Sequence, residues 1–224
     1  YPGQYGMAVL SRLPIAEEEA RTFRTVLWQD MPASLLPTDH YPPEAPEALH
    51  LSYKSHWDVP VRLPDGRALH LLASHPTPPV FDGPEDRNGR RNHDEIRFWL
   101  DYVSGNGWMT DDEGDAGALP DGAGFVILGD LNADPRDGDA RRGALLGLLS
   151  HPRVQDPRPG SSGAAAASVT QGGANTRHAG DPSLDTADWR DEGGPGNLRV
   201  DYVLPSSEWE VSGAGVFWPA PDHP

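Results

Sequence analysis

The sequence predicts a layered α/β domain with mixed β-sheets. Three observations support this prediction. Two alternating segments flank a hairpin signal within residues 56–74, a continuous apolar run occupies residues 125–128, and an amphipathic helix is expected over residues 92–103. A chain of 224 residues can bury a core of its own, so we expect a single domain over residues 1–224.

The first part of the chain combines short strand-like segments with irregular backbone. Residues 5–11 form a brief apolar run that is typical of a strand, and residues 49–54 alternate between apolar and polar side chains. Between them lies a proline-rich segment at about residues 29–48. We expect this segment to be a loop, because proline cannot donate a hydrogen bond within a central strand.

The clearest local signals are a hairpin and a helix. Residues 57–63 and 68–73 alternate, and the pair Asp65-Gly66 between them is a strong turn signal. Residues 92–103 place apolar side chains at helical spacing, at Ile96, Trp99, Leu100 and Val103. Both elements therefore offer an apolar face to the expected core.

The second half of the chain continues the same pattern. The apolar run 125–128 is typical of a strand covered on both faces. Residues 141–149 predict a short helix, and residues 198–204 and 211–218 predict two final strands. Residues 157–196 are rich in glycine, serine and alanine, so we expect a long loop there.

Composition excludes several classes of protein. The formal net charge is −16, from 34 acidic and 18 basic residues, so generic coating of nucleic acid is not expected. A bound cation would still allow such a chain to process phosphates. The absence of cysteine excludes disulfides and thiolate metal sites. Apolar stretches reach only about five residues, which is too short for a membrane-spanning helix.

The segment that most strongly indicates chemistry follows the apolar run and begins at Gly129. In an extended chain Asp130 and Asn132 point to the same side, where a carboxylate and a carboxamide could hold a water and a charged oxygen. The alternative is a simple polar turn. A calcium loop of the EF-hand type is excluded, because it requires glycine where Pro135 stands and glutamate where Arg141 stands.

Three further segments carry candidate functional groups. His75 comes directly after a strand, where functional side chains are frequent, although it could equally be a surface histidine. Asp201 lies between apolar neighbours of a predicted strand and needs a partner, which could be Arg199. Asp222 and His223 stand at the extreme end of the chain, where disorder is the ordinary expectation.

Taken in order, these segments resemble the endonuclease/exonuclease/phosphatase superfamily, which includes pancreatic-type deoxyribonucleases, abasic-site endonucleases, inositol-polyphosphate phosphatases and sphingomyelinases. The matching motifs are Gly-Met-Ala-Val-Leu-Ser-Arg from Gly6, Ser-His-x-x-x-Pro from Ser74, Gly-Asp-Leu-Asn from Gly129, Arg-Val-Asp-Tyr from Arg199 and Asp-His-Pro from Asp222. The resemblance implies a four-layer α/β sandwich, in which two packed mixed or antiparallel sheets are flanked by helices.

The resemblance implies roles for the residues that follow the first strands. Asp130 resembles the aspartate that orients or deprotonates the attacking water, and also serves as an expected metal ligand. Asn132 resembles the asparagine that positions this water and the phosphoryl oxygens. His75 resembles the phosphate-contacting histidine of the deoxyribonuclease branch. The expected reaction is metal-dependent hydrolysis of a phosphodiester or phosphomonoester.

The resemblance also assigns roles near the end of the chain. His223 resembles the active-site histidine that contacts the scissile phosphate, and Asp201 the carboxylate that orients this histidine. Asp222 resembles the preceding aspartate, which is a metal ligand in some members. Carboxylate and amide oxygens suit a divalent cation, with Mg²⁺ the first expectation and Mn²⁺ or Ca²⁺ the alternatives.

A basic segment precedes the expected helix at residue 92. Arg87, Asn88 and Arg91 could place hydrogen-bond donors near the N-terminus of that helix, which also favours anions. We therefore expect these residues to bind substrate. The alternative is a solvated loop in which arginine side chains pair with aspartates.

The family pattern is incomplete at the start of this sequence. Members carry an asparagine and a metal-binding glutamate on two strands that would precede Tyr1. We expect the domain to be N-terminally incomplete, with these strands missing from this chain, and the 224-residue chain alone to bind metal poorly. Acidic composition rich in glycine, proline, alanine and arginine suggests a bacterial source.

Three functions stay open at this point. The first is an activated-water phosphoesterase acting on a small phosphorylated substrate, a nucleotide, a lipid headgroup or DNA. The second is a catalytically impaired relative that binds an anion or a protein. The third is an acidic calcium-binding module. We expect a monomer without a membrane span; the compartment stays open, and secretion would require a signal segment outside this chain.

Overall fold

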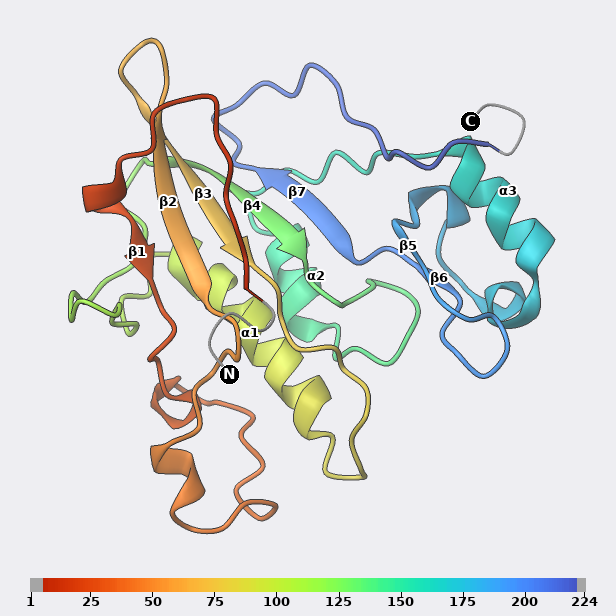
Figure 1. The fold of residues 1–224 in the computed structure, drawn as a ribbon, viewed down its shortest axis with the longest axis horizontal. Coiled ribbons are helices and arrows are strands. Elements are labelled where there is room, and N and C mark those ends of the chain that lie inside the picture. The colour runs from red at the N-terminus through yellow and green to blue at the C-terminus, as the bar shows by residue number, and fades with distance from the viewer. Residues whose placement is uncertain (1–5, 221–224) are drawn as a thin grey trace.

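The structure is a computed structural model that describes residues 6–220, built around a five-stranded β-sheet (Figure 1). The strand order is β1-β2-β3-β4-β7. These strands are β1 (Arg21–Thr22), β2 (His56–Arg62), β3 (Ala68–Ser74), β4 (Gly124–Asp130) and β7 (Asp201–Pro205). A separate two-stranded sheet contains β5 (Ala187–Asp188) and β6 (Asn197–Leu198). The mixed α+β class expected from the sequence is confirmed.

The connections between strands bring three strand ends to one edge of the large sheet. β2 and β3 form the expected antiparallel hairpin, with His56 opposite Ser74. β3 and β4 run parallel, because helix α1 (Arg87–Val103) carries the chain across between them. β7 returns antiparallel to β4 and begins opposite its last residue. The ends of β3 and β4 and the start of β7 therefore meet.

Helices α1 and α2 (Gly143–Leu149) cover one face of this sheet (Figure 1). Phe125 and Ile127 of β4 and the α1 side chains Phe98, Trp99 and Tyr102 are buried together in the core. α1 begins five residues earlier than its apolar pattern indicates, because its first turn is held by Asp82, whose carboxylate accepts hydrogen bonds from the backbone N–H groups of Asn88 and Gly89.

The opposite face of the sheet is only partly covered. Val126 and Leu128 point to this face and are half-buried, and Val203 of β7 is 64% exposed. The strand β4 was expected to be covered on both faces and is fully buried only toward the helices. Within residues 6–220 the second large sheet of the implied four layers is not formed; residues 6–15 cross in front of the sheet instead (Figure 1).

Three segments expected to be strands lack strand structure in the described part of the chain. Residues 6–11 and 211–218 have extended or irregular backbone without ladder pairing, and residue 5 lies outside the described range. Within residues 49–54 there is one isolated bridge, between Leu27 and His50. A strand requires a neighbouring strand to receive its hydrogen bonds. Residues 6–11 and 211–218 have no ladder partner among the described residues, and residues 49–51 pair only with the short segment at residues 26–28.

The proline-rich segment 29–48 is irregular between two short turns. The 3₁₀ turns of this half of the chain are η1 (Glu17–Glu19), η2 (Trp28–Asp30) and η3 (Ala45–Glu47). Trp28 is fully buried and its indole N–H donates to the carboxylate of Asp94 on α1. No helix among the described residues is long and apolar enough to cross a membrane.

Residues 157–198, here named the α3 lobe, correct the expectation of a long loop at 157–196. The lobe contains α3 (Ser162–Gln171), η4 (Gly173–Arg177), η5 (Pro182–Leu184), β5 and β6. Ser161 caps α3, since its hydroxyl accepts from the backbone N–H groups of Gly163 and Ala164. A run of alanine follows, and alanine has the highest helix propensity of all residue types. The helix was not predicted because this segment lacks an apolar face at helical spacing.

Two carboxylates, one buried and one half-buried, fasten the α3 lobe to the end of β4. Asp134 accepts backbone N–H groups of Arg136 and Asp137 at one oxygen and that of Arg199 at the other. Asp137 accepts two backbone N–H groups of the lobe, at residues 179 and 180. Arg199 pairs with Asp156, so it is not the partner of Asp201 that the sequence suggested.

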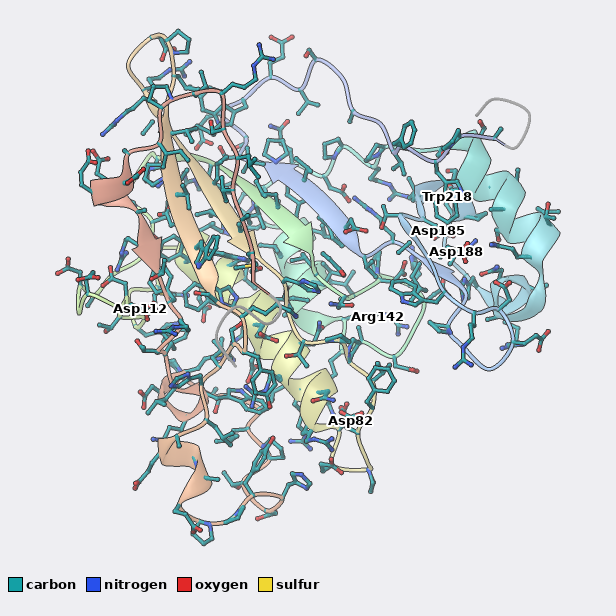
Figure 2. The ribbon with its side chains drawn as sticks, viewed as in Figure 1. Asp82, Asp112, Arg142, Asp185, Asp188 and Trp218 are labelled. Carbon is teal, nitrogen blue, oxygen red and sulfur yellow. The ribbon has the colours of Figure 1, made fainter. Side chains whose placement is uncertain are left out.

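Asp185 is a buried carboxylate of the lobe with an unfavourable environment (Figure 2). Burial raises its pKa to about 7, and the nearby carboxylates of Asp134 and Asp137 add to the rise. The folded state holds this proton more tightly than the unfolded chain. The contribution of Asp185 to the free energy of unfolding is therefore fully present below about pH 4 and is lost as the pH rises through 7.

Replacement of Asp185 by asparagine is therefore expected to stabilise the fold on the order of 2 kcal/mol at about pH 8 and to change little at about pH 4. Urea unfolding at the two pH values measures this difference. Asp188→Asn, on the neighbouring strand β5 and exposed, is the matched control and should show no such pH dependence (Figure 2). An equal effect of Asp185→Asn at both pH values would contradict the assignment.

Candidate active site

The last residues of β4 approach β3 unusually closely. Gly129 has a φ of +145°, and a Cβ atom at this position would lie 2.0 Å from the backbone oxygen of Ser74. Only glycine satisfies both the backbone conformation and the close approach. The next residue, Asp130, is thereby brought beside His75, which follows β3.

Asp130 and Asn132 are joined directly by a hydrogen bond. The backbone N–H of Asn132 donates to Oδ1 of Asp130 over 2.8 Å, and its side-chain Nδ2 donates to the backbone oxygen of Pro76 over 3.0 Å. Asn132 has a φ of +51°, so it has left the strand rather than continuing it as the period-two argument assumed. Asparagine tolerates this left-handed conformation better than most residues.

His75 lies against Asp130 at the open end of the site. Its Nε2 is 3.5 Å from Oδ2 of Asp130, and the two side chains are 40% and 31% exposed. Burial lowers the pKa of His75, the nearby Lys54 ammonium lowers it further, and the carboxylates of Asp130 and Asp201 partly offset the decrease. Together these effects favour the uncharged form of the ring.

Asp201 is the first residue of β7 and stands directly opposite Asp130. It is exposed, whereas the sequence suggested a half-buried position within the strand. Opposite residues of an antiparallel pair project to the same face, so the two carboxylates are neighbours. Although the residue as a whole is exposed, partial desolvation of its carboxylate by neighbouring atoms raises the pKa of Asp201; the hydroxyl of Thr186 lowers it, and the charge of Asp130 raises it again.

Lys54 is a component of this site that the motif analysis missed. Its Nζ donates to the backbone oxygen of His75 over 3.0 Å. Burial lowers the pKa of Lys54, and the carboxylates of Glu95 and Asp130 offset part of the decrease. One signal could have identified it: Lys54 is the single lysine in a chain of net charge −16.

Helix α1 holds the loop that carries His75. Asn92 is fully buried, and its Nδ2 donates to the backbone oxygens of Thr77 and Leu131, one from each loop of the site. Glu95 accepts the backbone N–H of Thr77 over 2.6 Å. Burial raises the pKa of Glu95, although these hydrogen bonds and Arg91 act in the opposite direction. The loops after β3 and β4 are thus fixed to the same two turns of one helix.

The residues expected to bind substrate at the start of α1 have other contacts. Arg91 is only 1% exposed, and its guanidinium donates to two backbone oxygens and lies over the rings of Trp28 and Tyr53. Its charge suggested a surface position, but it faces the core. Arg87 and Asn88 donate to the backbone oxygens of Phe81 and Val80, so they hold the preceding loop.

Asp222 and His223 lie outside the described residues, and the roles assigned to them stay predictions. The last described segment packs on the α3 lobe. The hydroxyl of Ser161 donates to the backbone oxygen of Trp218, beside the start of α3 (Figure 2).

The geometry agrees with a comparison of the sequence with protein families. The Endonuclease/Exonuclease/phosphatase family matches residues 1–223. The chain belongs to this family. The resemblance based on five short motifs is therefore confirmed. A comparison with curated proteins found no match.

Solved structures similar to this family member include three bacterial proteins. An endonuclease/exonuclease/phosphatase from Beutenbergia cavernae has 14% identity and a TM-score of 0.48, covering 88% of this chain and 39% of that chain. Sphingomyelinase C from Streptomyces griseocarneus has 16% identity and a TM-score of 0.34, with 68% and 42% covered. A beta toxin mutant from Staphylococcus aureus with bound magnesium ions has 12% identity and a TM-score of 0.37, with 70% and 43% covered. The chain therefore spans about two fifths of the length of these proteins.

The donor set of this family member suits a hard divalent cation. Two carboxylates with like charge, Asp130 and Asp201, stand opposite each other, an arrangement that is unfavourable without a cation. Mg²⁺ is commonly held by one or two carboxylates together with waters and substrate oxygens. Within residues 6–220, no group of three or more acidic or histidine side chains could hold a metal. Asp130 and Asp201 are the described residues that would hold such a cation, and they do not form a complete site by themselves.

Proposed function

We propose that this protein hydrolyses phosphate esters by attack of an activated water, with a divalent cation at Asp130 and Asp201. The observation that carries the proposal is the convergence of five groups at one sheet edge. Two carboxylates, a neutral imidazole, a carboxamide and an ammonium meet there, at Asp130, Asp201, His75, Asn132 and Lys54. Family membership supports the same class of reaction.

Each group has a defined task in such a reaction. Asp130 orients the attacking water and accepts its proton, a role that requires an ionised carboxylate. The neutral ring of His75 donates an N–H to a phosphoryl oxygen. Asn132 retains one Nδ2 proton beyond its bond to Pro76 and can donate it to the same phosphoryl group. A bound divalent cation would stabilise the charge that develops on the leaving oxygen.

Lys54 supplies positive charge for the phosphoryl group. Because the surrounding chain repels anions, this ammonium and the bound cation make the cleft attractive to phosphate. We expect Lys54→Gln to lower kcat/KM for a phosphate ester by about 100-fold. Lys54→Arg should recover part of the loss, since it keeps the charge while changing the geometry.

Steady-state kinetics measures both Lys54 variants, with urea unfolding as the check on the fold. Arg24→Gln provides the control, because it removes an exposed positive charge on the β1 side of the molecule. A stable Lys54→Gln variant with ordinary kcat/KM would show that the ammonium has only a structural bond to the loop.

The function is tested with p-nitrophenyl phosphate, bis(p-nitrophenyl) phosphate and plasmid DNA, each in Mg²⁺, Mn²⁺, Ca²⁺ or EDTA. We expect hydrolysis of at least one ester that EDTA abolishes. The small esters are the favoured class, because a net charge of −16 repels a long polyanion. Absence of hydrolysis under every condition would support the binding-only relative instead.

The calcium-binding alternative lacks support in the described residues. Asp111 pairs with Arg21, and the two oxygens of Asp112 accept bonds from Thr22 and Thr25 (Figure 2). After β4, the carboxylates of Asp134 and Asp137 accept backbone N–H groups. These side chains stabilise loops and have no arrangement typical of a calcium cage.

A further inference from the structure

A cavity of about 620 Å³ adjoins the proposed catalytic site. Asn132 lies in its lining, so the cavity borders one of the groups proposed to contact the phosphoryl oxygens. One wall is the loop at residues 78–81, and much of the remainder comes from the α3 lobe. Such a volume is typical of a site for a small organic molecule and far exceeds what one phosphate needs.

An exposed aromatic side chain stands at the cavity wall. Phe81 is 88% exposed and has a φ of +65°, a conformation that is costly for a bulky residue. The side chain of Arg87 donates to the backbone oxygen of Phe81, and that of Asn88 donates to the backbone oxygen of Val80. These two hydrogen bonds hold the strained loop in place. From the α3 lobe, Trp189 contributes a second aromatic ring that is 36% exposed. These rings provide surfaces on which a flat group can stack.

The cavity lining carries three carboxylates and two guanidinium groups, which differ in their contacts. The carboxylates of Asp134 and Asp137 line it, but their oxygens are occupied by backbone N–H groups. Asp139 is exposed. Arg177 and Arg190 also line the cavity, and neither guanidinium has a hydrogen bond or ion pair within the described part of the chain. Two guanidinium groups are suited to a second anionic group of a ligand.

We propose that this cavity binds the organic part of the substrate, and that the substrate is a nucleotide with two phosphate groups. The reacting phosphate lies at Asn132, the base stacks at Phe81 and Trp189, and the second phosphate meets Arg177 and Arg190. Only one part of this assignment rests on the proposed function, namely that the phosphate at Asn132 is the one that reacts. The binding of the nucleotide is separable from its hydrolysis.

Binding is therefore measured first, by isothermal titration calorimetry with adenosine 3′,5′-bisphosphate and AMP. The protein should bind the bisphosphate about tenfold more tightly than AMP, because a second charge-assisted contact is made. The Arg177→Gln/Arg190→Gln variant should bind the two equally, and Trp189→Ala should weaken both about tenfold. Arg24→Gln, with an exposed arginine outside the cavity lining, should leave both affinities unchanged.

Hydrolysis of p-nitrophenyl phosphate separates this inference from the function itself. Among the cavity variants, Phe81→Ala, Trp189→Ala and the double arginine variant, only the last should leave its kcat/KM unchanged, because this ester has no second phosphate but carries a ring that can stack. Equal binding of bisphosphate and AMP by the unaltered protein, or affinities that the cavity variants leave intact, would overturn the inference. Nucleotide binding without any ester hydrolysis would uphold the cavity and reject the catalytic proposal.

Discussion

Replacement of Asp130 by asparagine is expected to lower kcat for phosphate-ester hydrolysis by about 1000-fold. The substitution keeps the size of the side chain and its acceptor for the Asn132 N–H, which donates over 2.8 Å. It removes the negative charge that would accept the proton of the attacking water and would share a cation with Asp201. KM should change far less than kcat, because the lost interaction strengthens as the reaction proceeds.

Steady-state kinetics in saturating Mg²⁺ measures the loss. Asp121→Asn is the matched control, since it makes the same chemical change at an exposed turn before β4. Removal of a carboxylate from so acidic a protein should change activity little at that position. A folded Asp130→Asn protein with more than a tenth of the normal kcat would remove Asp130 from the catalytic role.

Replacement of Gly129 by alanine should disrupt both the fold and the site. The added Cβ would lie 2.0 Å from the backbone oxygen of Ser74, so β3 and β4 must separate where they deliver His75 and Asp130. The φ of +145° adds conformational strain for any residue with a Cβ. We expect a loss on the order of 3 kcal/mol in the free energy of unfolding, together with most of the activity.

Gly122→Ala separates strain from collision. Gly122 also has a positive φ, of +72°, but an added Cβ would meet no atom within 4 Å. Its substitution should cost only about 1 kcal/mol and leave hydrolysis intact. Urea unfolding and kinetics on both variants test the comparison; equal costs would show that close packing of the two strands is unimportant.

Much of the site could be predicted because its residues are tied to strand ends. His75 follows β3 and Asp130 ends β4, and parallel neighbours end at the same edge of a sheet. Asp201 begins the antiparallel strand that returns beside β4, so it stands opposite Asp130. The alternation of side chains along a strand accounts for these positions, whereas Asn132 reaches the site through a left-handed turn.

The remaining features depend on tertiary contacts that local pattern does not contain. Lys54 lies in irregular backbone ahead of β2 and reaches the site only because β2 and β3 pair. Arg91 has the charge of a surface residue, yet two aromatic rings and two backbone oxygens compensate its burial. In the α3 lobe, helix capping by Ser161 and backbone bonds to carboxylates replace the apolar signal that sequence analysis seeks.

The central claim is that a divalent cation and a phosphoryl group occupy one cleft, and the coupling between them tests it most directly. Isothermal titration calorimetry should show that inorganic phosphate raises the affinity for Mg²⁺ about tenfold, and that Mg²⁺ raises the affinity for phosphate by the same factor. The coupling should vanish in Asp130→Asn. The account would be contradicted if phosphate left the affinity for Mg²⁺ unchanged, or if the Asp130→Asn protein showed the same coupling as the unaltered protein.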